Sequence, residues 1–381
     1  MTSSEHAIPR EPSVVIVGAT HPHAGGVAQH NTRLAHVLIE QGERVRIESW
    51  KSQYPRGARN GLGTVPRDAP ELPPVDDVVE KLAWYSPWSW LSLGWRVRRT
   101  PTVVFAVIGP PHAIMYALPL LVLRRRQRVA VVHNVLPHDR SAVDKLLMAW
   151  LLRRMRAIIV HSNEQRDLAI ELGVEARRIQ VTPLPSPGFA RPAESIPSPP
   201  LLRGEKALTL LFFGMVRHYK GLDVLIAALA QCPDVRLVVA GHFWEPIDHY
   251  KSMLRTHGVA DRVELRPGYV DAPEIARLFA DADALVLPYR SGTASIVTDV
   301  AFEHGRAVVV SNVGTLADGV LDAGVGLVVP AEDVDALADA LRTLAQPETL
   351  RRLTEAVAAL PARDTERWSL YTEAFRRAQS A

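Results

Sequence analysis

"LTLLFF" (residues 208–213), "GMVRHYKG" (214–221) and "LDVLIAAL" (222–229) follow one another in this chain of 381 residues. The first run is short and apolar, as a buried strand is, and the third has apolar residues at the spacing of an amphipathic helix. A strand, a tight loop and a helix form the repeating unit of doubly wound α/β folds. The loop carries an arginine and a lysine between two glycines, which favours an anionic ligand there.

The same alternation extends in both directions from this stretch. Apolar runs with helix-sized segments between them predict six strands before it, at 13–18, 44–49, 102–108, 128–132, 157–162 and 179–183. Five more follow it, at 236–241, 262–267, 282–288, 306–311 and 326–330. Two successive series of strands and helices predict an α/β protein with two doubly wound, Rossmann-like domains.

A proline-rich segment separates the two series. Residues 183–200 contain seven prolines, and such a segment cannot continue a helix or a central strand. The sequence therefore predicts a first domain at 1–185, a linker at 186–204 and a second domain at 205–362. A C-terminal helix is expected at 363–381, and packing back on the first domain is one arrangement open to it.

Composition is that of a globular protein, with 47% hydrophobic and 22% charged residues. The single cysteine, Cys232, excludes an internal disulfide and fits a reducing compartment. The opening MTSSEHAIPREPS has no apolar core of the kind that a secretory signal requires. The longest apolar run, 113–123, is about half a membrane span and is interrupted by Pro119. We expect a cytoplasmic protein.

Positive charge is local, because the formal net charge is only +3. Arginines gather at three places, namely Arg96, Arg98 and Arg99; Arg124, Arg125, Arg126 and Arg128; and Arg153, Arg154 and Arg156. Aromatic residues lie just upstream, at Trp84, Tyr85, Trp88, Trp90 and Trp95. These features fit either solvated helix ends beside a buried aromatic cluster, or a surface that faces an anionic membrane from its inner side. We expect no nucleic-acid partner.

Ligands of open parallel sheets bind beyond the carboxyl ends of the strands, and two such domains facing each other form a cleft. In the opening stretch, Arg217 and Lys220 lie between Gly214 and the following helix. Two cations beside a helix start suit a diphosphate, although the spacing is not that of a P-loop.

The loop after the first strand, ATHPHAGGVAQH, places Gly25 and Gly26 at the start of a helix. It lacks the GxGxxG spacing of a dinucleotide site, and a simple tight turn remains an alternative. His21 and His23 lack a third ligand, so we expect no metal site.

Another strand is followed at once by His133, which would project toward a cleft or else be a structural histidine. The segment 288–311 contains Gly292, Thr293 and Ser295 before a helix, where backbone N–H groups suit phosphate. Asp299 and Glu303 share a helix face and could accept hydrogen bonds from sugar hydroxyls, or simply face solvent.

Several of these segments together resemble a known family. FFGMVRHYKGLDVLIAAL, LVVAG, LRPGYVDAPEIARLFADADALVLPY and AFEHGRAVVVSNVGTLADGV are similar to the donor-binding half of the retaining, sugar-nucleotide-dependent glycosyltransferases of the GT-B fold, of the family-four type. AGGVAQHNTRLAHVLIEQG and VVHN resemble the acceptor-side opening and the histidine loop of that family. The resemblance extends over residues 13 to 345.

The resemblance implies two Rossmann-like domains that face each other across a cleft, and no metal or other cofactor. It implies that Arg217 and Lys220 hold the donor diphosphate beside Gly214 and stabilise the charge on the departing nucleotide, and that His133 lies near the donor sugar. We expect these three residues, Arg217, Lys220 and His133, to be the catalytic ones. The other donor-side positions that it implies are Gly25 and Gly26 near the reacting centre, and Tyr269 and Val270 at the nucleobase. From the residues themselves we also expect Thr293, Ala294, Ser295 and Asp299 to bind the donor, although Asp299 is not equivalent to a family glutamate.

One departure affects the interpretation. The family pattern has two glutamates eight positions apart, and those positions here are Gly292 and Val300. The resemblance implies retaining transfer of a hexosyl unit from a nucleoside diphosphate sugar, which we expect to be a GDP- or UDP-sugar. The basic and aromatic first domain favours a glycan or lipid-linked acceptor, in cell-surface polysaccharide or glycolipid synthesis. A nucleotide-sugar epimerase of the same fold and a non-catalytic nucleotide-sugar binder remain alternatives.

Overall fold

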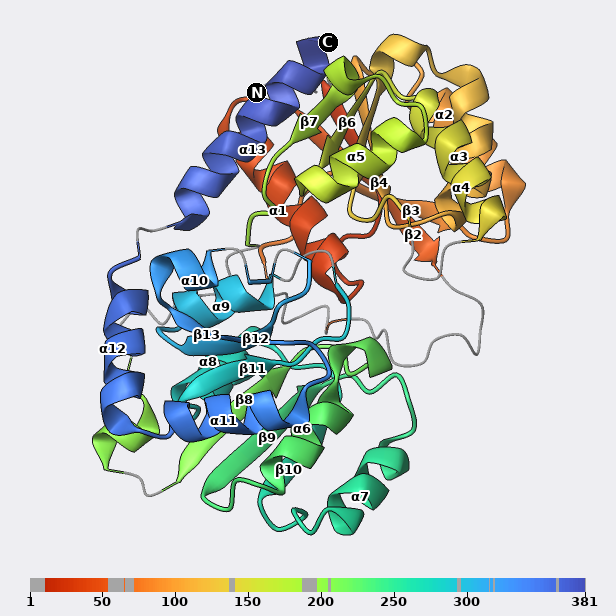
Figure 1. The fold of residues 1–381 in the computed structure, drawn as a ribbon. Coiled ribbons are helices and arrows are strands. Elements are labelled where there is room, and N and C mark those ends of the chain that lie inside the picture. Colours follow the sequence, from red (N-terminus) through yellow and green to blue (C-terminus); the bar gives the residue numbers. More distant parts are fainter. Residues whose placement is uncertain are drawn as a thin grey trace, which may run out of the picture. The chain divides into compact units, whose positions relative to one another are not determined.

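The computed structural model describes residues 11–53, 65, 72–136, 141–186, 197–204, 207–292, 296–314, 316–317, 319–360 and 363–380. They form two compact units (Figure 1). The described residues of the first unit come from Met1–Arg59, Thr64–Pro187 and Arg367–Ala381, and those of the second come from Gly188–Glu366.

The first unit contains a seven-stranded parallel sheet in the order β3-β2-β1-β4-β5-β6-β7. Its strands are β1 (Val14–Val17), β2 (Val45–Ser52), β3 (Val78–Ala83), β4 (Thr102–Val107), β5 (Arg128–Val132), β6 (Ala157–Val160) and β7 (Ile179–Val181). Its helices are α1 (Gly26–Glu40), α2 (Pro87–Arg96), α3 (Pro111–Val122), α4 (Ala142–Arg153), α5 (Asn163–Glu171) and α13 (Arg363–Ser380), with 3₁₀ turns η1 (Arg125–Gln127) and η2 (Ala176–Arg178).

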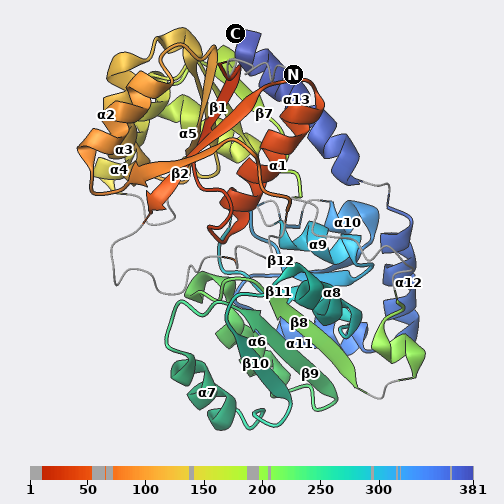
Figure 2. The same cartoon turned by 180° about the vertical axis from the view of Figure 1, so that it is seen from behind.

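Helices cover both faces of this sheet, as Figure 2 also shows. In β1, Val15 and Val17 belong to one hydrophobic core, while Val14 and Ile16 belong to another, because side chains alternate along a strand. The first core is completed by α2, α3, α4 and α5, and the second by α1 and α13.

The second unit contains a six-stranded parallel sheet in the order β10-β9-β8-β11-β12-β13. Its strands are β8 (Leu208–Phe213), β9 (Val235–Gly241), β10 (Val263–Pro267), β11 (Ala284–Leu287), β12 (Ala307–Ser311) and β13 (Gly326–Val329). Its helices are α6 (Leu222–Leu229), α7 (Ile247–Thr256), α8 (Ala272–Ala280), α9 (Val297–Glu303), α10 (Val320–Ala323), α11 (Val334–Leu344) and α12 (Pro347–Ala358), with 3₁₀ turns η3 (Pro200–Arg203) and η4 (His218–Lys220).

These sheets confirm the predicted doubly wound α/β class, and all twelve predicted strands occur. The sequence interpretation missed β3, an edge strand that pairs with β2 alone. Its sequence, VVEKLA, places Glu80 and Lys81 in the middle of the strand, and only Leu82 and Ala83 are buried. Such a strand has neither a continuous apolar run nor a regular alternation to reveal it.

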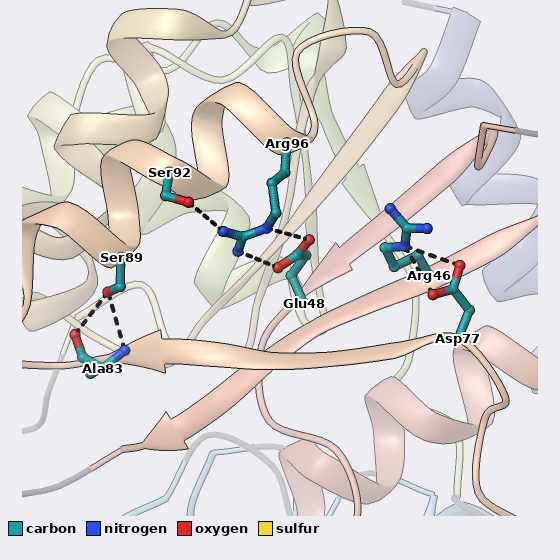
Figure 3. A network of polar contacts seen from close by, with 7 residues as sticks. All are labelled: Arg46, Glu48, Asp77, Ala83, Ser89, Ser92 and Arg96. Carbon is teal, nitrogen blue, oxygen red and sulfur yellow. Dashed lines mark hydrogen bonds and ion pairs between the residues drawn. The ribbon is translucent and has the colours of Figure 1, made fainter. Parts of the chain in front are cut away.

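Around β2 and β3, a polar network fixes the position of α2 (Figure 3). Glu48 on β2 is fully buried, and it accepts hydrogen bonds from Arg96 Nε at 3.1 Å and Nη2 at 2.5 Å. Ser89, in the first turn of α2, bonds to both the N–H and the carbonyl oxygen of Ala83. The helix is therefore attached to the sheet near both of its ends.

The predicted linker differs from the structure at its end. Of residues 186–204, the range 187–196 lies outside the described residues, but 197–204 belong to the second unit. Leu201 N donates to Asp283 Oδ1 at 2.7 Å, and Leu201 and Leu202 pack on the core of that unit. The second unit therefore begins within the predicted linker, because apolar side chains at the end of the proline-rich segment belong to its core.

The C-terminal helix α13 packs on the first unit. Trp368 stacks on His30 of α1 with ring centroids 5.5 Å apart, and its Nε1 donates to the Ser186 carbonyl oxygen at 2.8 Å. Within the ranges given above, none of the helices combines the length and the apolar character that crossing a bilayer requires.

Candidate functional site

Three glycines line the carboxyl edge of the second sheet. Gly214, Gly241 and Gly268 lie at the ends of β8, β9 and β10, with φ of 104°, 142° and 131°. Gly214 N donates to Ala240 O at 2.9 Å, and Gly268 N donates to Gly241 O at 3.0 Å. A Cβ on Gly241 would lie 1.9 Å from the Gly214 oxygen. The three turns therefore adjoin, and their bare backbone lets a ligand approach closely.

Lys220 reaches back over the end of β8. Its Nζ lies 3.4 Å from the position of a Cβ on Gly214, and 5.1 Å from the ring centre of Tyr289. The side chain is buried, with 7% exposure. Burial lowers the pKa of Lys220, but the phenol groups of Tyr289 and Tyr219 outweigh burial, so the net pKa is raised. Lys220 is therefore an ammonium ion at neutral pH.

Arg217 precedes Lys220 in the same loop, and the Lys220 N–H donates to its carbonyl oxygen at 2.8 Å. Its guanidinium stacks over Trp244 at 4.4 Å from the ring centroid. The loop is joined to the segment after β9, because Val216 N donates to His242 O at 2.7 Å and Trp244 N donates to Val216 O at 2.9 Å. A stacked guanidinium keeps its N–H groups in its own plane, where they can meet a phosphate bidentately.

Arg290 holds the basic loop in place. Its Nη1 and Nη2 donate to the two carboxylate oxygens of Asp223 at 2.7 and 2.6 Å, and Nη1 also donates to the His218 carbonyl oxygen at 2.9 Å. Its Nε donates to Glu332 at 2.8 Å. Burial alone would raise the pKa of Asp223, but the hydrogen bonds and charge of Arg290 lower it overall. The pair is therefore charged at neutral pH.

Two further contacts join the basic loop to its neighbours. Gly221 has φ of 69°, and a Cβ there would lie 2.0 Å from the Pro288 oxygen, so the two backbones are in contact. Glu245 accepts from His218 N at 3.0 Å and from Tyr250 Oη at 2.8 Å. The loop is therefore fixed from both sides before any ligand binds.

Other predicted donor-side residues of this unit follow strands of the same sheet or begin the helix after β11. Tyr269 and Val270 follow Gly268 after β10, and Tyr269 is exposed whereas Val270 is buried. Asp299 is half-buried in the first turn of α9. Three predicted positions, Thr293, Ala294 and Ser295, lie outside the described residues.

In the first unit, Gly25 caps α1 with φ of 114°, and Gly26 is the first helical residue. A Cβ on either glycine would meet no atom within 4 Å, so the backbone at this helix start is open. His23 Nε2 lies 2.9 Å from the Trp50 carbonyl oxygen, which gives this histidine a structural contact. Among the described residues, no group of three or more His, Cys, Asp or Glu side chains could hold a metal ion.

His133 follows β5 as predicted, and its N–H donates to the Val107 carbonyl oxygen at 2.8 Å. The residue as a whole is half-buried, but its ring atom Nε2 is shielded from solvent, and the ring lies 5.1 Å from that of His30 and 5.3 Å from that of His161, centroid to centroid. Burial and the neighbouring histidines hold the pKa of His133 well below its usual value, and burial lowers that of His30 to about 3 and that of His161 to about 4. All three rings are neutral at physiological pH.

Sequence reasoning missed several residues that shape the basic loop. Arg290 lies in the quoted segment 288–311, but its partner Asp223 is 67 positions away. Trp244 follows the end of β9 closely, in the position where polar and aromatic side chains of parallel sheets face ligands. That position was the one available signal for Trp244.

Two family models match the chain. Glycosyltransferase Family 4 matches residues 24–185, and Glycosyl transferases group 1 matches residues 207–347. A D-inositol 3-phosphate glycosyltransferase of Paenarthrobacter aurescens is 30% identical over 209 residues, which are 50% of this chain and 50% of that protein. A D-inositol 3-phosphate glycosyltransferase of Xylanimonas cellulosilytica is 31% identical over 204 residues, which are 49% of this chain and 48% of that protein. The chain matches these curated relatives over about half of their length.

Solved structures agree on the fold. Sucrose-phosphate synthase from Thermosynechococcus elongatus aligns with a TM-score of 0.72 at 18% identity, covering 96% of this chain and 99% of that one. Anabaena HepE in complex with UDP and glucose aligns with a TM-score of 0.72 at 15% identity, covering 97% and 100%. Two doubly wound parallel sheets, of seven and six strands, define the GT-B fold class. Within that class, the chain belongs to the glycosyltransferases of the family-four type.

Proposed function

We propose that this protein transfers a hexosyl unit from a nucleoside diphosphate sugar, a GDP- or UDP-sugar, to a glycan or lipid-linked acceptor with retention of configuration. The observation that carries the proposal is the basic loop. The Lys220 ammonium and the stacked Arg217 guanidinium lie beside Gly214 at the carboxyl edge of the second sheet. Relatives named as D-inositol 3-phosphate glycosyltransferases, and the neighbour HepE with UDP and glucose, support it.

The basic loop would act on the leaving group. When the bond between the sugar and the diphosphate breaks, negative charge grows on the diphosphate, and a fixed ammonium and guanidinium stabilise that charge more than they stabilise the bound donor. Arg290 and Glu245 hold the loop in place beforehand, so little reorganisation is needed when the charge develops. The developing positive charge on the sugar needs no protein nucleophile in this scheme.

His133 would serve as a neutral hydrogen-bonding group near the donor sugar. Its lowered pKa excludes a standing positive charge at neutral pH, which would oppose the cationic sugar of the transition state. A neutral imidazole still offers one N–H donor or one nitrogen acceptor to a hydroxyl.

A non-catalytic nucleotide-sugar binder is the second candidate, and one observation favours it. The two positions where the family pattern has glutamates are Gly292 and Val300, and Val300 is buried in the core of the second unit. Neither residue can accept a hydrogen bond through its side chain. Under this alternative, donor binding is retained without turnover.

Thermal unfolding with GDP-, UDP-, dTDP- and ADP-sugars tests donor binding. A ligand at about 100 times its Kd stabilises the native state by about 2.7 kcal/mol. We expect stabilisation by one nucleotide class, lost in Arg217→Ala and Lys220→Met and kept in Arg255→Ala, an exposed arginine of α7. Release of nucleoside diphosphate that needs an acceptor then separates transfer from binding alone. Absence of stabilisation by every nucleotide class would contradict both candidates.

A further inference from the structure

Three neighbouring helices of the first unit carry outward-facing apolar side chains. Helices α2, α3 and α4 pack on one core through their inner faces, and a Cβ on Gly94 of α2 would lie 3.1 Å from the Pro119 Cα of α3. Their outer faces expose large apolar residues three or seven positions apart, so that each pair shares one helix face. The pairs are Trp88 and Trp95, Ile114 and Leu121, and Val143 and Leu146. We call these six residues the apolar face.

The exposure of the apolar face is large. Trp88 is 78% exposed, Leu121 is 79% exposed and Leu146 is 70% exposed. Single exposed apolar residues are ordinary, but three adjacent helices with such pairs form a patch that normally marks an interaction site.

Arginines gather at the C-terminal ends of the same three helices. Gln127 Nε2 donates to the Arg98 carbonyl oxygen at 3.0 Å, which links the group after α2 to the group after α3. Arg125 Nη2 donates to the Arg153 carbonyl oxygen at 3.3 Å, which links that group to the end of α4. The three arginine groups thus form one basic rim, made of Arg98, Arg99, Arg124, Arg126, Arg153 and Arg154.

Charge is strongly segregated along the chain. Between Trp84 and Arg156 the sequence has eleven arginines and one lysine against two aspartates and no glutamate. The rest of the chain has 32 basic and 39 acidic residues. Asp144, the acidic residue in the first turn of α4, is occupied in a capping box with Ser141. From outside this segment, Glu11 lies 3.7 Å from Arg99, and both side chains of that pair are exposed. Within the part of their own segment that the structure describes, the other arginines of the rim have no acidic residue to neutralise them.

We propose that the apolar face and the basic rim together bind the surface of a bilayer that contains anionic lipids. Indole rings favour the boundary between headgroups and acyl chains, and arginines attract and hydrogen-bond lipid phosphates. Arg98 lies 5.2 Å from the ring centre of Trp95, and Arg154 lies 4.1 Å from that of Trp150. These pairs place guanidinium and indole groups side by side, so that both could enter the headgroup layer of a bilayer together.

The charge pattern favours a bilayer over a second copy of this chain. Two copies meeting through this surface would bring two basic rims together, and like charges at an interface disfavour association. An anionic bilayer is complementary to the rim and also accepts the apolar residues. The proposal concerns the first unit alone and is independent of the sugar that the protein transfers.

Sedimentation with vesicles tests the proposal, using the full chain without any sugar nucleotide. The vesicles are phosphatidylcholine alone and phosphatidylcholine mixed with phosphatidylglycerol. We expect the protein to bind the mixed vesicles, and we expect salt to weaken this binding. Binding to phosphatidylcholine alone should be weaker by about tenfold or more. Equal binding to both compositions, or binding to neither, overturns the proposal.

Two variants test the two parts of the surface. Trp88→Ser/Leu121→Ser/Leu146→Ser removes apolar contacts, and Arg124→Gln/Arg126→Gln removes exposed charges of the rim. Each should lower partition into the mixed vesicles by about tenfold or more. Because all five side chains are exposed, thermal unfolding and nucleotide-sugar binding by the second unit should stay unchanged.

Matched controls come from the second unit. Leu321→Ser removes an apolar residue of 64% exposure from α10, and Arg255→Gln/Arg352→Gln removes two exposed charges. Both controls should bind the mixed vesicles as the unaltered protein does. A loss in the controls as large as in the test variants overturns the proposal. The proposal is also overturned if the unaltered protein self-associates, and if the triple variant loses this self-association but still binds the mixed vesicles.

Discussion

Replacing Arg290 by alanine removes two hydrogen bonds to the Asp223 carboxylate and one to the His218 carbonyl oxygen. Hydrogen bonds to charged groups contribute about 1.5–3 kcal/mol each at buried sites. Both side chains are partly exposed, at 17% and 26%, so water compensates for part of the loss. We expect Arg290→Ala to lower the free energy of unfolding of the second unit by about 3 kcal/mol, since it also leaves the Asp223 charge without its partner.

A double-mutant cycle measures the Asp223–Arg290 interaction itself. Arg290→Ala, Asp223→Ala and the double variant should give a coupling free energy of about 1.5–2 kcal/mol. Because a two-unit protein need not unfold in one step, amide exchange of peptides from β8 and β9 reports the second unit separately. Glu332→Ala is the control, since its carboxylate is 63% exposed and should contribute about 0.5 kcal/mol or less. A coupling energy below about 0.5 kcal/mol would refute the role given to Arg290.

The same variant tests preorganisation of the basic loop. Arg217 and Lys220 remain present in Arg290→Ala, but the His218 carbonyl loses its anchor. Donor affinity should fall about tenfold, because binding must then also order the loop. An unchanged Kd, together with the expected loss of stability, would show that Arg290 supports the fold without positioning the cations.

Two further predictions concern backbone contact and pH. Gly241→Ala should destabilise the second unit by about 3 kcal/mol in urea unfolding, because the new Cβ would meet the Gly214 oxygen. Gly258 also has a positive φ but has open space around it, so Gly258→Ala should cost about 1 kcal/mol. Equal costs for the two variants would contradict the close contact between Gly241 and Gly214. The buried histidines of the first unit have lowered pKa values, so the unfolded chain binds protons at these rings more readily than the folded chain does. The stability that these neutral rings contribute should be complete above about pH 6.5 and should fall by up to about 1.4 kcal/mol per pH unit per histidine toward pH 4. Urea midpoints between pH 7 and pH 4.5 check this, and a flat profile would contradict burial of the neutral rings of His30, His133 and His161.

Most of the fold could be predicted from the sequence because the strands of parallel sheets are buried on both faces. Runs such as residues 102–107 and 208–213 are apolar almost throughout, and turns rich in glycine or proline end them. The edge strand β3 could not be found in this way. Its half-exposed residues satisfy no apolar pattern, and its position depends on pairing with β2.

The cations of the candidate site could be predicted, but their environment could not. Arg217 and Lys220 were chosen because cations between glycines at the end of a strand suit phosphate. Nothing local shows that Lys220 is buried against Tyr289, or that Arg217 stacks on Trp244. These contacts arise because parallel strands bring the loops after β8, β9 and β11 to one edge of the sheet.

His133 shows most clearly how distant residues decide the chemistry of one position. Its place after β5 could be read from the sequence, and a free imidazole there would titrate near neutral pH. In the structure, its neighbours are His30 from α1 and His161 from the end of β6, and Trp368 and Tyr371 of α13 pack against His30 in turn. Burial among these rings keeps the imidazole neutral at physiological pH, a state in which it offers one hydrogen-bond donor and one acceptor. Trp368 and Tyr371, more than 230 positions away in the chain, thus shape the surroundings of His30, whose ring adjoins that of His133.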